Sequence, residues 1–205
     1  LVMATGILSV GMKLEGFDLL SEVLLGVCAL SFVVLGALTA WRFVAYLSAV
    51  EDDFTDPRRA FGFFTFVAGT NVLGVRLGLE GWYTATAVLL VFSGVAWLVL
   101  GYVVPWTAVL GRQERPVLAT ANGTWFIWVV ASQSIAVVAA SLEPVYDGLR
   151  HELAILAVFA WSVGVVLYAA CAVFVALRVM RRPSESVILT HQPRPAHLKT
   201  LPSPF

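Results

Sequence analysis

Charged side chains are scarce in this 205-residue chain, and the two signs balance. Asp, Glu, Lys and Arg make up 13% of the residues, with 13 basic and 13 acidic side chains, whereas soluble domains carry about 25%. A net charge of zero without a basic patch indicates no nucleic-acid partner. The composition predicts a membrane protein whose main partner is the lipid bilayer.

Residues that usually carry chemistry are few as well. The chain has three histidines and two cysteines and lacks the HExxH, GxSxG, Walker and GxGxxG motifs. Cys28 and Cys171 fall inside apolar stretches, where a buried thiol behaves as a small hydrophobe. His191 and His197 have no Cys or carboxylate partner at ligand spacing. We therefore expect no enzyme activity, no cofactor and no metal site.

Long hydrophobic runs are abundant. Crossing roughly 30 Å of hydrocarbon at 1.5 Å per residue takes about 20 apolar residues. Six apolar segments follow one another, at Leu1 to Met12, Leu19 to Trp41, Phe61 to Leu77, Trp82 to Val104, Asn122 to Leu142 and Leu153 to Leu177. The predicted fold class is an all-α membrane protein with about six transmembrane helices, arranged as three helical hairpins.

The two ends of the chain differ from this pattern. The first segment, Leu1 to Met12, is too short to span a bilayer, and we expect Leu1 to lie inside a helix that starts earlier. The last 23 residues contain five prolines, which break helices. We predict a transmembrane domain at 1–182 and a disordered cytoplasmic tail at 183–205.

Basic residues are distributed unequally between the two sets of connections. Ten of the 13 fall in the second and fourth connections and in the tail, and three fall on the other side. The positive-inside rule places the richer side in the cytoplasm. The expected protein is a multi-pass protein of the cell membrane with both termini cytoplasmic.

Polar side chains concentrate in the odd-numbered segments. Amides in hydrocarbon need a hydrogen-bond partner or a watery cavity, so we expect inner odd helices that line a path and outer even helices that face lipid. The predicted lining residues, chosen by helical spacing, are Thr5, Ser9, Thr65, Phe66, Gly69, Asn122, Phe126 and Gln133. The alternative is that these glycines and amides serve helix packing in a non-transporting scaffold or assembly subunit.

Three stretches resemble one known family. They are MATGILSVGM (Met3 to Met12), DPRRAFGFFTFVAGTNVLGVRL (Asp56 to Leu77) and TWFIWVVASQSIAVVAA (Thr124 to Ala140). Together they resemble the tellurite-resistance and C4-dicarboxylate transporter family, which includes plant slow-type anion channels and fungal malate transporters. The resemblance extends from Met3 to about Arg182.

This resemblance implies a ten-helix fold of five hairpins, whose odd helices form a central pore and whose subunits often assemble as trimers. It implies transport of a small anion or dicarboxylate, and leaves channel and carrier as alternatives. The family's gating phenylalanine belongs to the ninth helix, so no residue of this chain takes that role. The chain is expected to be a fragment with three hairpins, which inserts alone but does not conduct.

Overall fold

The computed structural model is helical throughout the residues that it describes, which are 1–56, 59–110 and 123–190. No β-strand occurs among them, in agreement with an all-α protein. The long helices are α1 (Val2–Leu14), α2 (Asp18–Ala45), α4 (Phe64–Leu79), α5 (Tyr83–Val104), α7 (Phe126–Leu142) and α8 (Arg150–Thr190).

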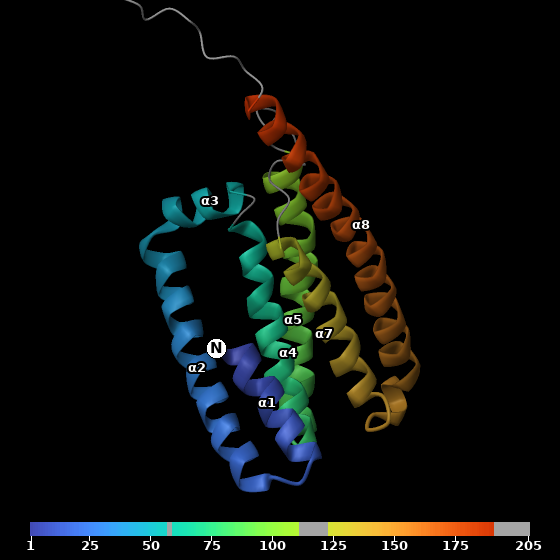
Figure 1. Cartoon of the computed structure of the whole chain (residues 1–205). Coiled ribbons are helices and arrows are strands. Elements are labelled where there is room, and N and C mark those ends of the chain that lie inside the picture. Colours follow the sequence, from blue (N-terminus) through green and yellow to red (C-terminus); the bar gives the residue numbers. More distant parts are fainter. Residues whose placement is uncertain (57–58, 111–122, 191–205) are drawn as a thin grey trace, which may run out of the picture.

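Consecutive long helices pack as antiparallel pairs, α1 with α2, α4 with α5 and α7 with α8 (Figure 1). The first two pairs are joined by tight turns that contain Gly16 at φ 81° and Gly81 at φ 82°. This left-handed conformation is favourable only for glycine, because it lacks a Cβ. The turns therefore allow each second helix to fold directly back along the first.

Burial differs sharply between the helices. In the most apolar window of each span, 61% of the residues around α4 and 50% of those around α7 are buried, against 6% in α2, 22% in α5 and 11% in α8. The helix α4 contacts both α1 and α7. Val67, Ile135 and Ala139 belong to the main apolar core. The core thus lies around α4 and α7.

Five helices are long and apolar enough to cross a membrane by length and composition, and α1, with 13 residues, is shorter. The N-terminal end of α1 lies about midway along α2 (Figure 1).

The expected boundary at Arg182 lies inside α8, which continues to Thr190. Residues 191–205 are outside the described part. The division into domain and disordered tail stays a prediction.

The connection between α2 and α4 contains a short helix, α3 (Leu47–Thr55), which lies across the ends of both (Figure 1). The ring of Phe54 stacks on Phe63 with centroids 4.2 Å apart. The hydroxyl of Thr107 donates to the Phe54 carbonyl at 2.9 Å. Thr107 belongs to the π-helical turn η2 (Pro105–Leu110) that follows α5. Helix α3 therefore ties three long helices together at one end of the molecule.

Candidate functional site

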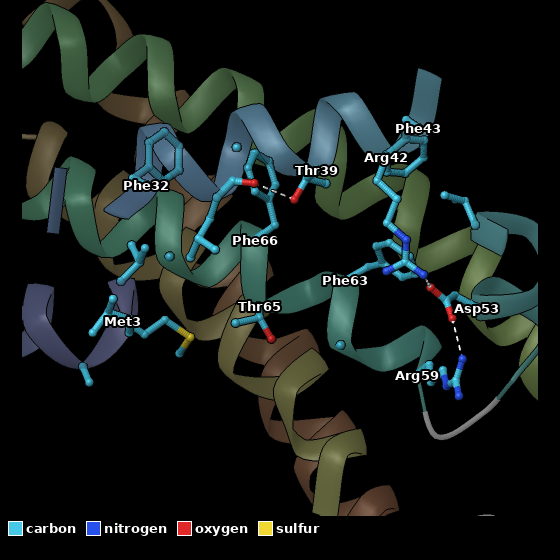
Figure 2. Close-up of a pocket in the computed structure, with 18 residues that line it drawn as sticks. Met3, Phe32, Thr39, Arg42, Phe43, Asp53, Arg59, Phe63, Thr65 and Phe66 are labelled. Atoms are coloured by element: carbon cyan, nitrogen blue, oxygen red, sulfur yellow. Dashed lines mark hydrogen bonds and ion pairs between the residues drawn. The ribbon is translucent and has the colours of Figure 1, made fainter. Parts of the chain in front are cut away.

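A cavity of about 730 Å³ lies between α2 and α4, beyond the N-terminal end of α1 (Figure 2). Its volume is in the range of small-molecule sites. Three predicted lining residues, Thr65, Phe66 and Gly69, lie on its wall. The other lining residues are Leu1, Val2, Met3, Ala4, Phe32, Leu35, Gly36, Thr39, Arg42, Phe43, Val50, Asp53, Arg59, Gly62 and Phe63.

The wall of the cavity is largely aromatic and aliphatic. Phe66 stacks on Phe32 of α2 with centroids 5.9 Å apart and meets Phe92 of α5 edge to face at 5.7 Å. These contacts fix the Phe66 ring between α4 and two neighbouring helices. Gly69 is buried, and the carbon Cγ1 of Val2 lies 3.4 Å from the position that a Cβ on Gly69 would take. The wall is therefore closely packed on the α4 side.

Charged groups gather at one end of the cavity, next to α3. The Asp53 carboxylate accepts from Arg42 Nη2 through Oδ2 and from Arg59 Nη1 through Oδ1, the latter at 3.0 Å. Its side chain is only 7% exposed, whereas that of Arg42 is 50% exposed and that of Arg59 is 68% exposed. One buried carboxylate thus holds two accessible guanidinium groups at the rim of the cavity (Figure 2).

A second polar cluster lies at the opposite end of α4, around a fully buried arginine. Arg76 Nε donates to the hydroxyls of Ser9 and Ser21 at 2.9 and 3.1 Å, and Nη1 donates to Glu80 Oε1 at 2.8 Å. Each serine hydroxyl also donates to the carbonyl of the other at 2.7 Å. Ser9, predicted to line a path, is therefore at the junction of α1, α2 and α4. The Nη2 atom of Arg76 is buried and has no partner among the described residues.

Glu80 connects this buried cluster to the surface. Its carboxylate accepts from Arg76 and lies 3.1 Å from Lys13 Nζ, which in turn bonds Asp18 at 2.9 Å. The hydrogen bond from Arg76, and then that from Lys13, hold the pKa of Glu80 below its ordinary value of 4.5. Both donors stabilise the ionised form.

This shift predicts a stability that depends on pH. A lowered pKa in the folded state stabilises the protein fully above the ordinary pKa, and that contribution is lost as pH falls through the folded-state value. We expect the difference in melting temperature between the wild type and Glu80→Gln to be constant above about pH 6 and to shrink in more acidic buffer. Thermal unfolding in detergent across this range measures it, and a difference that grows on acidification contradicts the prediction.

Asn71, the amide in the third segment, is fully engaged between helices. Its Nδ2 donates to Ser134 Oγ of α7 at 2.9 Å, and its Oδ1 accepts from Ser93 Oγ of α5 at 2.6 Å. Trp97 Nε1 of α5 likewise donates to Ser132 Oγ of α7 at 3.0 Å. These polar groups join α4, α5 and α7 to one another, and none of them is on the cavity wall.

The remaining predicted residues that the structure describes lie apart from the cavity wall. The Thr5 hydroxyl bonds back to the carbonyls of Leu1 and Val2. Phe126 packs edge to face on Tyr168 of α8. Gln133 Nε2 donates to the Trp161 carbonyl of α8 at 3.3 Å. Asn122 lies outside the described residues. The structure thus brings together Thr65, Phe66 and Gly69 and places Thr5, Ser9, Phe126 and Gln133 elsewhere, and the lining role of all eight residues stays a prediction.

The charged residues of both clusters were missed as site residues by the sequence analysis. Arg42, Asp53 and Arg59 were assigned to a connection, and only helix α3 brings the carboxylate between the two arginines. Arg76 was counted among the basic residues of the outer side. A usable signal was its position only one residue before the end of an apolar segment, where a charge needs partners. Within the described part, no group of three metal-ligating side chains occurs.

These features define an all-helical, multi-pass membrane protein with polar contacts inside its helix bundle. The family model for the voltage-dependent anion channel (SLAC1) matches residues 1–191. The chain belongs to this family, and the resemblance drawn from the sequence is confirmed. No curated protein and no solved structure matches the chain.

Proposed function

We propose that this chain contributes the α1, α4 and α7 helices to a path through which a small anion or C4-dicarboxylate crosses the cell membrane. Membership of the voltage-dependent anion channel family carries the proposal, because that family comprises anion transporters and not enzymes. No cofactor takes part in this function. Channel and carrier mechanisms are both compatible with it.

The burial contrast supports an inner position for α1, α4 and α7. Helix α4 packs against both α1 and α7, whereas α2, α5 and α8 expose rows of large apolar side chains such as Leu38, Val91 and Val166. Such faces are suited to lipid, which solvates apolar side chains without cost. In the proposed arrangement, the six segments cross the membrane as three hairpins with the even helices outside.

The proposed orientation places the end with α3 in the cytoplasm and both termini of the protein on that side, toward which the N-terminal end of α1 points from about the middle of α2 (Figure 1). Arg42 and Arg59 lie at that end, and the unequal distribution of basic residues supports this side. The cavity with Thr65 and Phe66 then opens toward the cytoplasm. Family resemblance supports a trimeric assembly.

The alternative is a non-transporting scaffold, which the contacts of Asn71 and Gln133 favour. Both amides bond to neighbouring helices, as expected for residues that hold helices together at about 0.6 kcal/mol each. The two proposals assign different roles to Thr65, whose side chain is exposed on the cavity wall. It takes part in transport in the first and has no transport role in the second.

Anion flux in proteoliposomes tests the proposal, measured for the printed chain and for the longest open reading frame that contains it. We expect selective anion flux from the longer protein and a severalfold decrease with Thr65→Val, because a neutral hydroxyl donor is removed from the path. Val88→Ala, at an exposed position of α5, is the matched control and should leave flux unchanged. Absence of anion flux from both proteins contradicts the transport proposal. If flux is unchanged by Thr65→Val, the cavity does not lie on the transport path.

A further inference from the structure

The rim of the cavity carries two guanidinium groups whose hydrogen-bonding capacity is only partly used. Each guanidinium has five N–H donors in a planar fork. Asp53 engages Arg42 through Nη2 and Arg59 through Nη1, and the Nε atom of Arg59 lies 3.7 Å from Asp56. Both arginine side chains are at least half exposed. The two forks can therefore reach an additional acceptor from solvent.

The same two groups are held close together by a carboxylate that has little access to water. The two oxygens of Asp53 bond one arginine each, so Arg42 from the last turn of α2 and Arg59 directly before η1 (Ala60–Phe63) approach a single anionic centre (Figure 2). Guanidinium forks bind planar oxyanions well, because their N–H groups match the spacing of two oxygens. Asp53 thus occupies the position that an oxyanion from solution would take between them.

We propose that Arg42 and Arg59 form a binding site for planar oxyanions, of the carboxylate or nitrate type, and that Asp53 is a tethered competitor for it. The proposal rests on the transport function, since it makes this site the entrance to the cavity. An arriving oxyanion replaces one or both bonds from Asp53. Because Asp53 lies on α3, its release also loosens the link between α2 and α4.

The charges near the site define the comparison that is needed. Among the residues that the structure describes, Arg42 and Arg59 are the only basic side chains on the cavity wall, and Asp53 is the only acidic one. Asp56 lies beside Arg59 outside that wall, and Asp52 precedes Asp53 on α3. Removing any of these carboxylates raises the local positive charge by one. If Asp53 is a competitor, only its removal frees the guanidinium groups of Arg42 and Arg59. If it acts only through its charge, removing Asp52 or Asp56 should have the same effect.

Nitrate binding to the purified chain, measured by isothermal titration calorimetry in detergent, tests the site. We expect Asp53→Asn to tighten nitrate binding roughly ten- to a hundredfold, the ratio for one charge-assisted hydrogen bond that no longer competes. Asp52→Asn removes the same charge and should change the nitrate affinity by less than about threefold. The affinity for chloride, which is spherical, should increase less in Asp53→Asn than the affinity for nitrate. Arg42→Gln and Arg59→Gln should each abolish the gain in the Asp53→Asn background.

Equal tightening by Asp52→Asn and Asp53→Asn would show a general effect of charge and overturn the proposal. Weaker nitrate binding by a folded Asp53→Asn protein would also overturn it, because Asp53 would then position the arginines for the ligand. If Asp53→Asn fails to fold, carbodiimide labelling of the wild type replaces it. Nitrate should then increase modification of Asp53 relative to chloride at equal ionic strength, and unchanged labelling contradicts the proposal.

Binding and transport can be judged separately. If Asp53→Asn tightens nitrate binding but neither protein shows anion flux, the oxyanion site is supported and the transport function is contradicted. Flux without nitrate competition at Asp53 supports the transport function and overturns the site.

Discussion

Glu80→Ala is expected to destabilise the folded chain more than Arg76→Met does, although Arg76 is fully buried and Glu80 is about one-third exposed. The alanine leaves the guanidinium of Arg76 buried without a carboxylate, and removing one partner of an ion pair is destabilising when the charge that remains is buried. The methionine removes that charge and fills similar space with an apolar chain. Ser9 and Ser21 remain bonded to each other's carbonyls in both variants.

Thermal unfolding and the yield of monodisperse protein in detergent measure this order. The double variant Glu80→Ala with Arg76→Met should recover part of the loss, since neither charge then remains. Glu143→Ala is the matched control, because Glu143 is about as exposed as Glu80 but pairs at 2.6 Å with Arg150, whose side chain is 58% exposed and not buried. Its effect should be small. A larger loss from Arg76→Met than from Glu80→Ala would show that packing and hydrogen bonds, not charge balance, decide the stability of this cluster.

Gly6→Val should prevent α1 from packing in its observed place. A Cβ at position 6 would lie 2.5 Å from Val72 Cγ1 and 3.1 Å from Cys28 Sγ. Val72 is β-branched and cannot move aside by a free rotamer change. Overpacking of this kind costs about 1–3 kcal/mol for the first added carbons, and a valine adds further branches. We expect Gly6→Ala to lower the melting temperature clearly and Gly6→Val to lower the yield of folded protein.

A matched position lies on the same helix. A Cβ on Gly11 would meet nothing within 4 Å, so Gly11→Ala should be neutral or slightly stabilising through helix propensity. Val72→Ala removes the Cγ1 atom in question and should partly rescue Gly6→Ala. If Gly11→Ala is as harmful as Gly6→Ala, or if Val72→Ala gives no rescue, the close approach of α1 and α4 is not what limits stability.

Sequence periodicity predicted the long helices well, because five of the six apolar segments coincide with helices of membrane-spanning length. It identified the stripe of α7 that contains Gln133 but not what that stripe contacts. In the structure the amide of Gln133 reaches the Trp161 carbonyl of α8, and its side chain lies against Gly164. A face can be read from spacing, whereas its partner depends on how helices distant in sequence are placed.

The charged clusters show the same limit more strongly. Asp53 and Arg59 lie six positions apart in the sequence, which suggests no contact in a connection without regular structure. Their bond requires α3 to end at Thr55 and η1 to begin at Ala60. Arg76 meets Ser9 and Ser21 only because α1 and α2 fold against α4. Local patterns do not contain such long-range pairings.

The bonds of Asn71 bear on how the chain is assembled during synthesis. Helix α4 is the least apolar of the five spanning helices, and its Asn71 amide is satisfied by Ser93 of α5 and Ser134 of α7. When α4 leaves the ribosome, neither partner has yet emerged beside it. Its amide therefore stays without these partners in the translocon until α5 emerges and supplies the first hydroxyl, and α7 completes the set later. Release of α4 into lipid is then coupled to the arrival of the next helix, so that the hairpin, not the single helix, is the unit of insertion.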